Sequence, residues 1–268
     1  METLMLWKTV PGRCEEVPVL EYYPAENKRC DTAVVIFPGG GYWIRAEHEG
    51  KGYAQFLNTL GIDAFVCQYR IAPHEFPLPL LDARRAVQYV RKNANKYGID
   101  PKKIGVMGSS AGGHLAATVS TLFEEYNDVL IEKDEIDSVD FIPDFQILCY
   151  PVIALNGFGH FGCRKILLGE RIDDEVLTEH LCAQNNVSEK TPKAFIWHTF
   201  DDGGVNVKNS LAYAVALKDN SVDCELHIFQ NGNHGLGLAL DNESVGQWRK
   251  QLEIWFRHNG LLGEKNEI

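Results

Sequence analysis

A serine stands at the centre of a short pattern that is typical of nucleophilic catalysis. Residues 108–112 read Gly-Ser-Ser-Ala-Gly, which places Ser110 in the middle of Gly-x-Ser-x-Gly. The apolar run 103–107 precedes the pattern and an alanine-rich stretch follows it, so a strand, a sharp turn and a helix are expected there. Such a turn lifts the serine hydroxyl out of the sheet edge, and the flanking glycines let strand and helix approach closely. We therefore expect Ser110 to be a nucleophile; the alternative is a small-residue turn that serves packing alone.

Two neighbours of Ser110 are weaker candidates for the chemistry. Ser109 carries a hydroxyl but falls at the wrong place in the pattern. His114 lies one turn further along the same predicted helix, with its side chain expected to point into the fold. We expect His114 to have a packing or supporting role and not to be the base.

A nucleophilic serine needs a base, and that base needs an acid that fixes its tautomer. In a strand–turn–helix context of this kind the chain order is serine, then aspartate or glutamate, then histidine. His234 lies in a loop rich in glycine and asparagine after the apolar run 224–229, and we expect it to be the base. Asp201 and Asp202 both follow the run 194–198, and this order leaves open which of them is the acid.

Three consecutive glycines follow the apolar run 33–37, in the segment 38–42 with the sequence Pro-Gly-Gly-Gly-Tyr. Glycines in series cost conformational entropy, which makes sense where the backbone must approach another group closely. An acyl-transfer site needs N–H donors for the developing oxyanion, and Gly40, Gly41 and Ala111 are our candidates for an oxyanion hole. A phosphate-binding loop is the alternative, but neither of the glycine patterns typical of such loops is present.

These residues can meet only if a sheet brings several loops to one edge. Short apolar runs alternate with helical patterns, which is typical of a parallel sheet with helices on both faces. Residues 5–23 instead resemble antiparallel edge strands, which brings the expected sheet to about eight strands. Because ligands bind at the carboxyl ends of parallel strands, the loops after them are expected to carry the reactive groups. The pattern predicts strands at 33–37, 62–69, 103–107, 145–150, 194–198 and 224–229, and helices at 49–60, 79–97, 111–122, 207–218 and 245–258.

One stretch, residues 156–191, does not fit the alternation. It follows the sixth strand, and its glycines, histidines and scattered charges predict a small helical insertion over the carboxyl edge of the sheet. A lid and a peripheral structural excursion are both open interpretations. The chain shows no repeat, low-complexity tract or linker, so residues 1–268 are expected to form a single α/β domain.

The overall charge and the cysteines limit the class of protein. Lys and Arg number 26 against 37 Asp and Glu, which gives a formal net charge of −11 and disfavours nucleic acid and anionic membranes as partners. The seven cysteines are scattered, and no Cys-x-x-Cys pair is present, so we expect reduced thiols and no metal site. The sequence shows neither a secretory signal pattern nor a membrane-spanning run, and the expectation is a cytoplasmic protein.

Beyond these patterns, the chain resembles the α/β-hydrolase esterases close to the hormone-sensitive-lipase group. Within them it is most similar to bacterial acetyl-xylan and feruloyl esterase-like proteins, often called sugar hydrolases. The resemblance extends over most of the chain, from about residue 34 to residue 256. It implies the α/β-hydrolase fold, a Ser-Asp-His triad, and no metal or organic cofactor. The similarity rests on five segments, 38–42, 69–73, 108–114, 197–202 and 233–237.

The same resemblance bears on the choice of acid. Such hydrolases often show His-x-x-x-Asp after the strand, and counting from His198 leads to Asp202. Asp202 is therefore favoured as the acid, with Asp201 as a cap or turn residue.

Two departures from the pattern of related esterases stand out. The glycine loop begins with Pro38 where related esterases commonly have histidine, which fits the sugar-esterase branch. Residues 203–206 read Gly-Gly-Val-Asn where relatives usually carry prolines, which makes the acid loop more flexible.

The resemblance also implies a substrate class. It implies hydrolysis of a small-molecule ester with a short acyl group, and an acetylated sugar or xylo-oligosaccharide is the first expectation. Tyr42 and Trp43, beside the glycine loop, are candidate substrate-binding residues that either stack on a sugar or wall an acyl pocket, with plain packing as the alternative. Arylformamidases and peptidases share the scaffold, and a catalytically inactive binding protein is a further alternative. The sequence leaves the oligomeric state open, a homodimer included.

Overall fold

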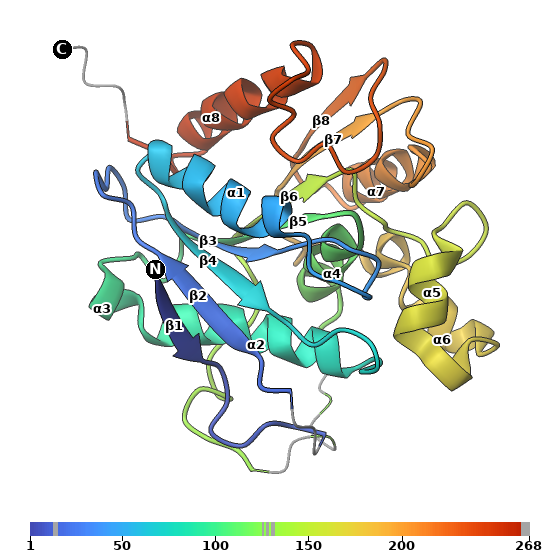
Figure 1. Ribbon diagram of the computed structural model, residues 1–268, viewed down its shortest axis with the longest axis horizontal. Coiled ribbons are helices and arrows are strands. Elements are labelled where there is room, and N and C mark those ends of the chain that lie inside the picture. Colours follow the sequence, from blue (N-terminus) through green and yellow to red (C-terminus); the bar gives the residue numbers. More distant parts are fainter. Residues whose placement is uncertain (13–15, 125, 127–128, 130–131, 264–268) are drawn as a thin grey trace.

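An eight-stranded sheet runs through the centre of the protein (Figure 1). The computed structural model describes residues 1–12, 16–124, 126, 129 and 132–263. The strands are β1 (Glu2–Met5), β2 (Val19–Tyr23), β3 (Ala33–Phe37), β4 (Asp63–Gln68), β5 (Ile104–Ser109), β6 (Phe145–Cys149), β7 (Ala194–Thr199) and β8 (Cys224–Phe229). Their order is β1-β2-β4-β3-β5-β6-β7-β8; β3 to β8 pair in parallel, whereas β1 pairs antiparallel with β2, and β2 antiparallel with β4. The mostly parallel sheet expected from the sequence is confirmed.

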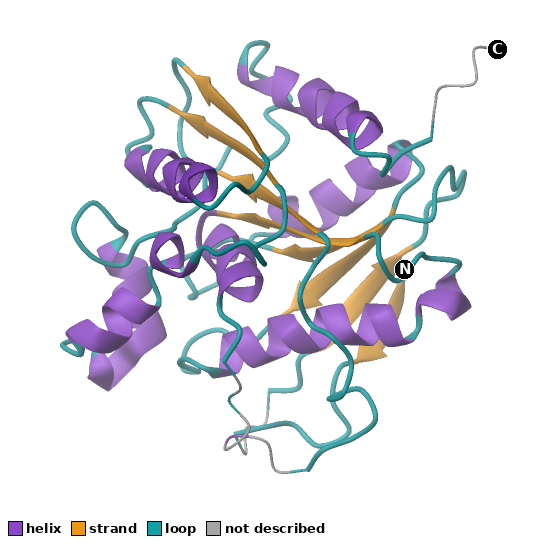
Figure 2. Ribbon diagram, turned by 180° about the vertical axis from the view of Figure 1, so that it is seen from behind, coloured by secondary structure: helices purple, strands orange, loops and turns teal. Residues whose placement is uncertain are grey.

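Helices cover both faces of the sheet, and each face has its own hydrophobic core (Figures 1 and 2). On one face lie α1 (Glu47–Thr59) and α8 (Trp248–His258), and on the other α2 (Leu78–Lys92), α4 (Ser110–Thr121) and α7 (Lys208–Asp219). Strands buried on both faces read as continuous apolar runs, which is why β3, with all five residues buried, shows no alternation. The first core includes Tyr53, Leu57, Trp248 and Leu252, and the second includes Leu80, Val87, Leu115, Ala116 and Tyr213.

The chain differs from the sequence prediction at three elements. The helix expected at 79–97 is broken, because α2 ends at Lys92 and the short α3 (Ala94–Tyr97) begins after Asn93. The Asn93 amide donates to the carbonyl of Tyr89 at 2.8 Å and so competes with the helical hydrogen bonds there.

The other two differences lie near the chain ends. The first edge strand, β1, comes mostly before the expected range 5–23. The helix expected at 245–258 opens with a turn of 3₁₀-helix, η4 (Val245–Gln247), before α8. The remaining predicted strands and helices agree with the structure to within two residues at each end.

The insertion follows β6, the sixth strand, and carries α5 (Phe161–Leu168), η2 (Gly169–Arg171), α6 (Glu175–His180) and η3 (Ala183–Asn186). Figure 1 shows α5 and α6 beside the sheet, outside both helical layers. Their inner side chains are nevertheless part of the second core, and backbone hydrogen bonds connect the insertion to the rest of the domain. The Phe76 N–H donates to the carbonyl of Leu167 at 2.9 Å, and buried residues on the inner side include Cys163, Leu167, Leu168, Leu181 and Cys182.

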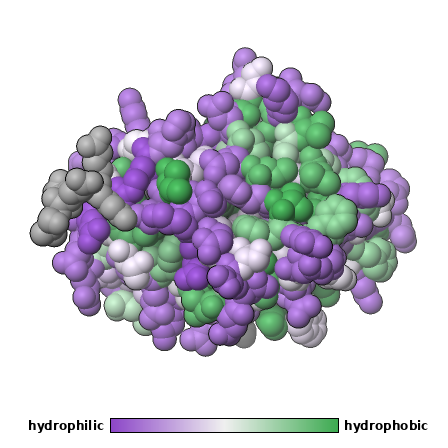
Figure 3. Space-filling view, turned by 90° about the horizontal axis from the view of Figure 1, so that it is seen from above, coloured by the Kyte–Doolittle hydropathy of each residue, from purple (hydrophilic) through white to green (hydrophobic). Residues whose placement is uncertain are grey.

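Part of the protein surface is hydrophobic. Figure 3 shows hydrophobic side chains gathered toward the right of that view. Large apolar side chains that stay exposed in or beside loops after parallel strands include Trp43, Ile44, Phe161, Phe200 and Leu240. Within the ranges that the structure covers, no helix is both long and apolar enough to cross a membrane.

Candidate active site

Ser110 lies at the junction between β5 and α4, as the first residue of the helix. Its φ of +52° is in the left-handed region, which costs a non-glycine residue of order 1–3 kcal/mol and is typical of strained functional turns. The neighbouring glycines permit this turn. A Cβ on Gly108 would lie 2.0 Å from the carbonyl oxygen of Gly112, and a Cβ on Gly112 would lie 2.0 Å from that of Phe37. The close approach of strand and helix therefore requires glycine at both positions.

The structure brings His234 and Asp202 to Ser110 from two loops that start side by side. β7 and β8 are paired so that Thr199 lies opposite Phe229, and Asp202 and His234 follow these two residues. His234 Nε2 lies 2.8 Å from Ser110 Oγ, and His234 Nδ1 lies 2.8 Å from Asp202 Oδ2. An ionised carboxylate can only accept hydrogen bonds, so Nδ1 carries the proton and Nε2 is free to accept the proton of the Ser110 hydroxyl.

The surroundings of Asp202 keep its carboxylate ionised. Its side chain is only 1% exposed, and this burial alone raises the pKa. Hydrogen bonds from His198, from His234 and from the Val205 N–H outweigh burial, so that the pKa of Asp202 lies well below its ordinary value. Oδ1 accepts the N–H groups of Gly204 and Val205 at 2.7 and 2.9 Å, which leaves Oδ2 for the two histidines.

Asp201 has a different position, although it is the neighbouring residue. Its carboxylate is exposed and accepts hydrogen bonds from the Asn231 amide at 3.0 Å and from the Gly232 N–H at 2.7 Å. Both partners belong to the loop that carries His234. Asp201 thus holds that loop against the loop after β7, whereas Asp202 contacts the imidazole itself.

His198 is a residue of the site that the sequence prediction missed. Its side chain is fully buried, and its Nε2 lies 3.0 Å from the Val205 carbonyl and 3.3 Å from Asp202 Oδ2. Both of these oxygens are acceptors, so Nε2 carries the proton, while Nδ1 lies 2.8 Å from the Ser210 hydroxyl. The spacing His-x-x-x-Asp could have indicated this contact, because it places His198 near the end of β7, four residues before Asp202.

The glycine loop after β3 lies against the serine. A Cβ on Gly39 would stand 3.1 Å from Ser110 Cβ. Gly40 and Gly41 have φ values of +127° and +67°, and among the described residues neither of their N–H groups donates to a protein acceptor. The Ala111 N–H belongs to the first turn of α4, whose N–H groups have no acceptor within the helix. Within the described residues none of these three N–H groups has a recorded protein partner, so Gly40, Gly41 and Ala111 remain candidates for the oxyanion hole.

Tyr42 does not suit the substrate-binding role expected from the sequence. Its side chain is 1% exposed, and its hydroxyl lies 2.8 Å from His114 Nδ1, so no face of the ring is open to a sugar. The ring is buried because the loop turns at Tyr42 with a φ of +63° and directs the ring into the second core. Trp43 is 65% exposed and remains a candidate.

His114 has the supporting position that was expected. It is buried, and its ring connects Tyr42 at Nδ1 with the carbonyl of Leu181 at Nε2, 2.8 Å away. His114 thereby links the glycine loop to the insertion. Burial lowers the pKa of His114 from 6.5 to about 4, although the hydrogen bond with Leu181 works in the opposite direction.

The depressed pKa of His114 predicts a loss of stability in mild acid. The unfolded chain takes up this proton near pH 6.5 and the folded protein only near pH 4, so acidification between these values favours unfolding. The contribution of neutral His114 to the free energy of unfolding is fully present above about pH 6.5. About 2 kcal/mol of it is lost between pH 7 and pH 5. Urea unfolding of wild type and His114→Gln at both pH values measures it. Equal losses in the two proteins would contradict the prediction.

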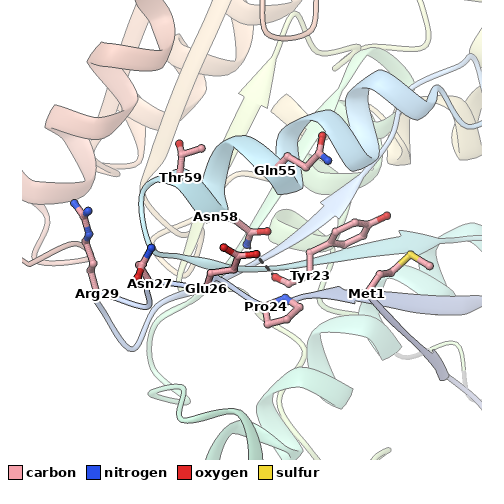
Figure 4. Close-up of a pocket in the computed structure, with 9 residues that line it drawn as sticks. All are labelled: Met1, Tyr23, Pro24, Glu26, Asn27, Arg29, Gln55, Asn58 and Thr59. Carbon is pink, nitrogen blue, oxygen red and sulfur yellow. Dashed lines mark hydrogen bonds between the residues drawn. The ribbon is translucent and has the colours of Figure 1, made fainter.

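A hollow of about 480 Å³ lies away from the candidate site, where β2 and α1 end (Figure 4). Tyr23 ends β2 there, and the Asn58 amide on α1 donates to its carbonyl at 3.0 Å. The lining residues are Met1, Tyr23, Pro24, Glu26, Asn27, Arg29, Gln55, Asn58 and Thr59, none of which belongs to the candidate site. In the described part of the chain, no group of three or more His, Cys, Asp or Glu side chains is placed to hold a metal ion.

The sequence of the chain is similar to those of known proteins. Residues 20–217 match the family model BD-FAE. The chain is 37% identical to endo-1,4-beta-xylanase B of Butyrivibrio fibrisolvens and 33% identical to an acetylxylan esterase of Xylanibacter ruminicola, in each case over 84% of its own length. It spans only 35% and 45% of these two relatives, so it corresponds to one part of each.

Solved structures match over nearly the full chain. An acetyl ester-xyloside bifunctional hydrolase from Caldicellulosiruptor lactoaceticus superposes with a TM-score of 0.92 and 45% identity, covering 98% of this chain and 97% of that one. A thermophilic esterase of Thermogutta terrifontis with bound propionate gives a TM-score of 0.80 at 25% identity, covering 99% and 96%. The expected α/β-hydrolase fold is confirmed, and the chain belongs to the BD-FAE family.

Proposed function

We propose that the protein hydrolyses carboxylic esters through an acyl-enzyme formed on Ser110. The observation that carries this proposal is the continuous line of hydrogen bonds from Ser110 Oγ through His234 to Asp202, with both distances at 2.8 Å. A serine on a strained turn, a histidine of defined tautomer and a buried carboxylate are the parts that nucleophilic catalysis by a hydroxyl requires.

The proposed steps follow from the geometry. His234 Nε2 takes the proton of Ser110 as Oγ attacks the ester carbonyl, and Asp202 stabilises the imidazolium that forms. The N–H groups of Gly40, Gly41 and Ala111 donate to the developing oxyanion. His234 then returns the proton to the leaving alcohol, which departs and leaves the acyl group on Oγ. Water, activated by His234, attacks that ester in the same way and releases the carboxylic acid and free Ser110.

The proposed substrate is a short acyl ester, first of all an acetyl ester, of a xylose-based sugar. The relatives that support it are an acetylxylan esterase, a xylanase and an acetyl ester-xyloside hydrolase. Exposed apolar side chains beside the carboxyl ends of the strands, such as Trp43, Phe161 and Phe200, offer contact area for a sugar ring or an acyl group. A net charge of −11 favours a neutral ester over an anionic one.

A substrate panel tests this proposal. Acetate release from acetylated xylobiose is measured beside p-nitrophenyl acetate, butyrate and octanoate, N-formylkynurenine and a peptide amide. We expect kcat/KM to be highest for acetyl esters and to fall with acyl length. A preference for N-formylkynurenine would identify an arylformamidase, and cleavage of the peptide alone would identify a peptidase. Turnover of none of these substrates, together with no labelling of Ser110 by a fluorophosphonate, would point to a binding protein.

A further inference from the structure

A buried carboxylate lies behind the candidate site without having a place in the proposed chemistry. Glu49, in the first turn of α1, is 3% exposed. Its Oε2 accepts the N–H of Gly39 at 2.9 Å, and its Oε1 accepts the hydroxyl of Tyr150 at 2.6 Å. Within the described residues, the basic group recorded within 4 Å is His48, whose Nε2 lies 3.8 Å from Oε1. Both of these hydrogen bonds to the carboxylate therefore come from neutral donors.

The hydroxyl of Tyr150 extends the contact to the loop that carries His234. It accepts the N–H of Gly237 at 2.9 Å, three residues after the imidazole. The Tyr150 ring also packs edge-on against His234, with ring centroids 5.1 Å apart at an interplanar angle of 74°. Tyr150 follows the last residue of β6, and its φ of +36° turns the side chain toward these partners.

The same group of side chains reaches the end of β5, the strand that precedes the nucleophile. The hydroxyl of Tyr53 lies 3.3 Å from that of Tyr150 and 2.7 Å from Ser109 Oγ, one residue before Ser110. Gly39, on the other side, has no room for a side chain, because a Cβ there would lie 2.4 Å from Glu49 Oε2. One buried cluster thus touches the glycine loop, the histidine loop and the end of β5.

Burying a carboxylate and several hydroxyls costs free energy unless every group is paired with good geometry. A fully paired network of this kind gains little net stability but restricts the elements it joins to one arrangement. The elements joined here carry the oxyanion donors and the base. Their relative position matters for catalysis, because a displacement of about 1 Å in a reacting geometry can lower a rate by about 100-fold.

We propose that Glu49 and Tyr150 are positioning residues that fix the oxyanion loop and the His234 loop relative to each other. The proposal rests on the ester hydrolysis proposed above. It assigns to Glu49 no contact with substrate and no proton transfer. Its carboxylate holds Gly39, and through Tyr150 it holds Gly237, so that the donors at Gly40 and Gly41 and the imidazole are correctly spaced before the substrate arrives.

The test measures kcat and KM for p-nitrophenyl acetate, with active sites counted by fluorophosphonate labelling. Tyr150→Phe removes the shared hydroxyl, and Glu49→Ala removes the carboxylate. We expect each to lower kcat about 10- to 100-fold with KM changed less than about twofold. Because the two residues act as one unit, the double variant should lose about as much as either single variant.

A conservative variant and two controls separate positioning from general damage. Glu49→Gln can still accept from Gly39 through its oxygen and donate to the Tyr150 oxygen through its nitrogen, so its kcat should stay within about fivefold of wild type. Tyr213→Phe removes another buried hydroxyl, which donates to Gln146 at 3.0 Å on the other face of the sheet. Glu47→Gln changes an exposed carboxylate on the same helix. Both controls should keep kcat within about twofold.

The outcomes are distinguishable. A Tyr150→Phe protein that keeps kcat within twofold of wild type overturns the positioning role, and so does an equal loss in Tyr213→Phe. If Glu49→Ala does not fold, the comparison of Tyr150→Phe with Tyr213→Phe decides alone. Failure of the wild-type protein to turn over any ester contradicts the proposed function instead, whereas active wild type with fully active Tyr150→Phe contradicts only the positioning role.

Discussion

Replacing Ser110 with alanine is expected to lower kcat/KM for an acetyl ester by about 10⁵-fold. The variant loses the only atom that the structure places 2.8 Å from His234 Nε2 among the described residues. No neighbouring hydroxyl can substitute, because Ser109 is fully buried and its Oγ is engaged with Tyr53 at 2.7 Å. Residual activity in the variant would come from the oxyanion donors and from substrate binding alone.

The size of this effect can be measured against a matched serine. Ser120 lies on the same helix, is buried, and donates to the carbonyl of Ala116 at 2.8 Å, so Ser120→Ala tests the loss of a hydroxyl away from the site. It should retain wild-type kcat/KM. Ser110→Ala should also fail to react with a fluorophosphonate that labels wild type and Ser120→Ala. A Ser110→Ala protein with activity within tenfold of wild type would remove the serine from the mechanism.

Much of the fold and part of the site could be predicted from the sequence because they depend on local pattern. The apolar run before Ser110 and the glycines around it reflect a turn that only small residues permit, and the clash distances at Gly108 and Gly112 show why. The loops of Asp202 and His234 were predictable because parallel strands end at one edge. Helix and strand bounds were predictable to within two residues wherever the apolar period was clear.

The residues that the sequence did not indicate depend on partners far along the chain. Glu49 appears in the sequence as one of two acidic residues at the start of a helix, and its burial depends on a contact with Tyr150, 101 positions later. Tyr42 was a candidate for substrate binding with packing as the alternative, and its left-handed backbone turns the ring to His114. Such backbone reversals at non-glycine residues, and pairings between distant side chains, leave no periodic pattern.

The choice between the two adjacent aspartates illustrates the same limit. The spacing from His198 favoured Asp202, but spacing alone could not tell a residue that orients a base from one that holds a loop. The structure separates them through their partners, since Asp202 contacts the imidazole of His234 whereas Asp201 contacts Asn231 and Gly232. Substitutions at the two positions should therefore differ greatly in their effect on the rate.

Replacing Asp202 with asparagine is expected to lower kcat about 10⁴-fold while leaving KM nearly unchanged. The N–H groups of Gly204 and Val205 both donate to Oδ1, so the asparagine oxygen takes that position and its NH₂ group faces His234. An NH₂ group donates, so Nδ1 of His234 must become the acceptor and the proton moves to Nε2. In that tautomer Nε2 cannot take the proton of Ser110.

Asp201→Asn is the matched control for this change. It removes the negative charge from an exposed side chain that accepts hydrogen bonds from Asn231 and Gly232, and its kcat should stay within about tenfold of wild type. The pH dependence adds a second check. Hydrogen bonds hold the pKa of Asp202 well below its ordinary value despite burial, so this carboxylate stays ionised at pH 5 and its protonation does not cause any loss of wild-type activity there. If Asp201→Asn lost as much activity as Asp202→Asn, the two loops would act as one unit and the tautomer of His234 would not explain the effect.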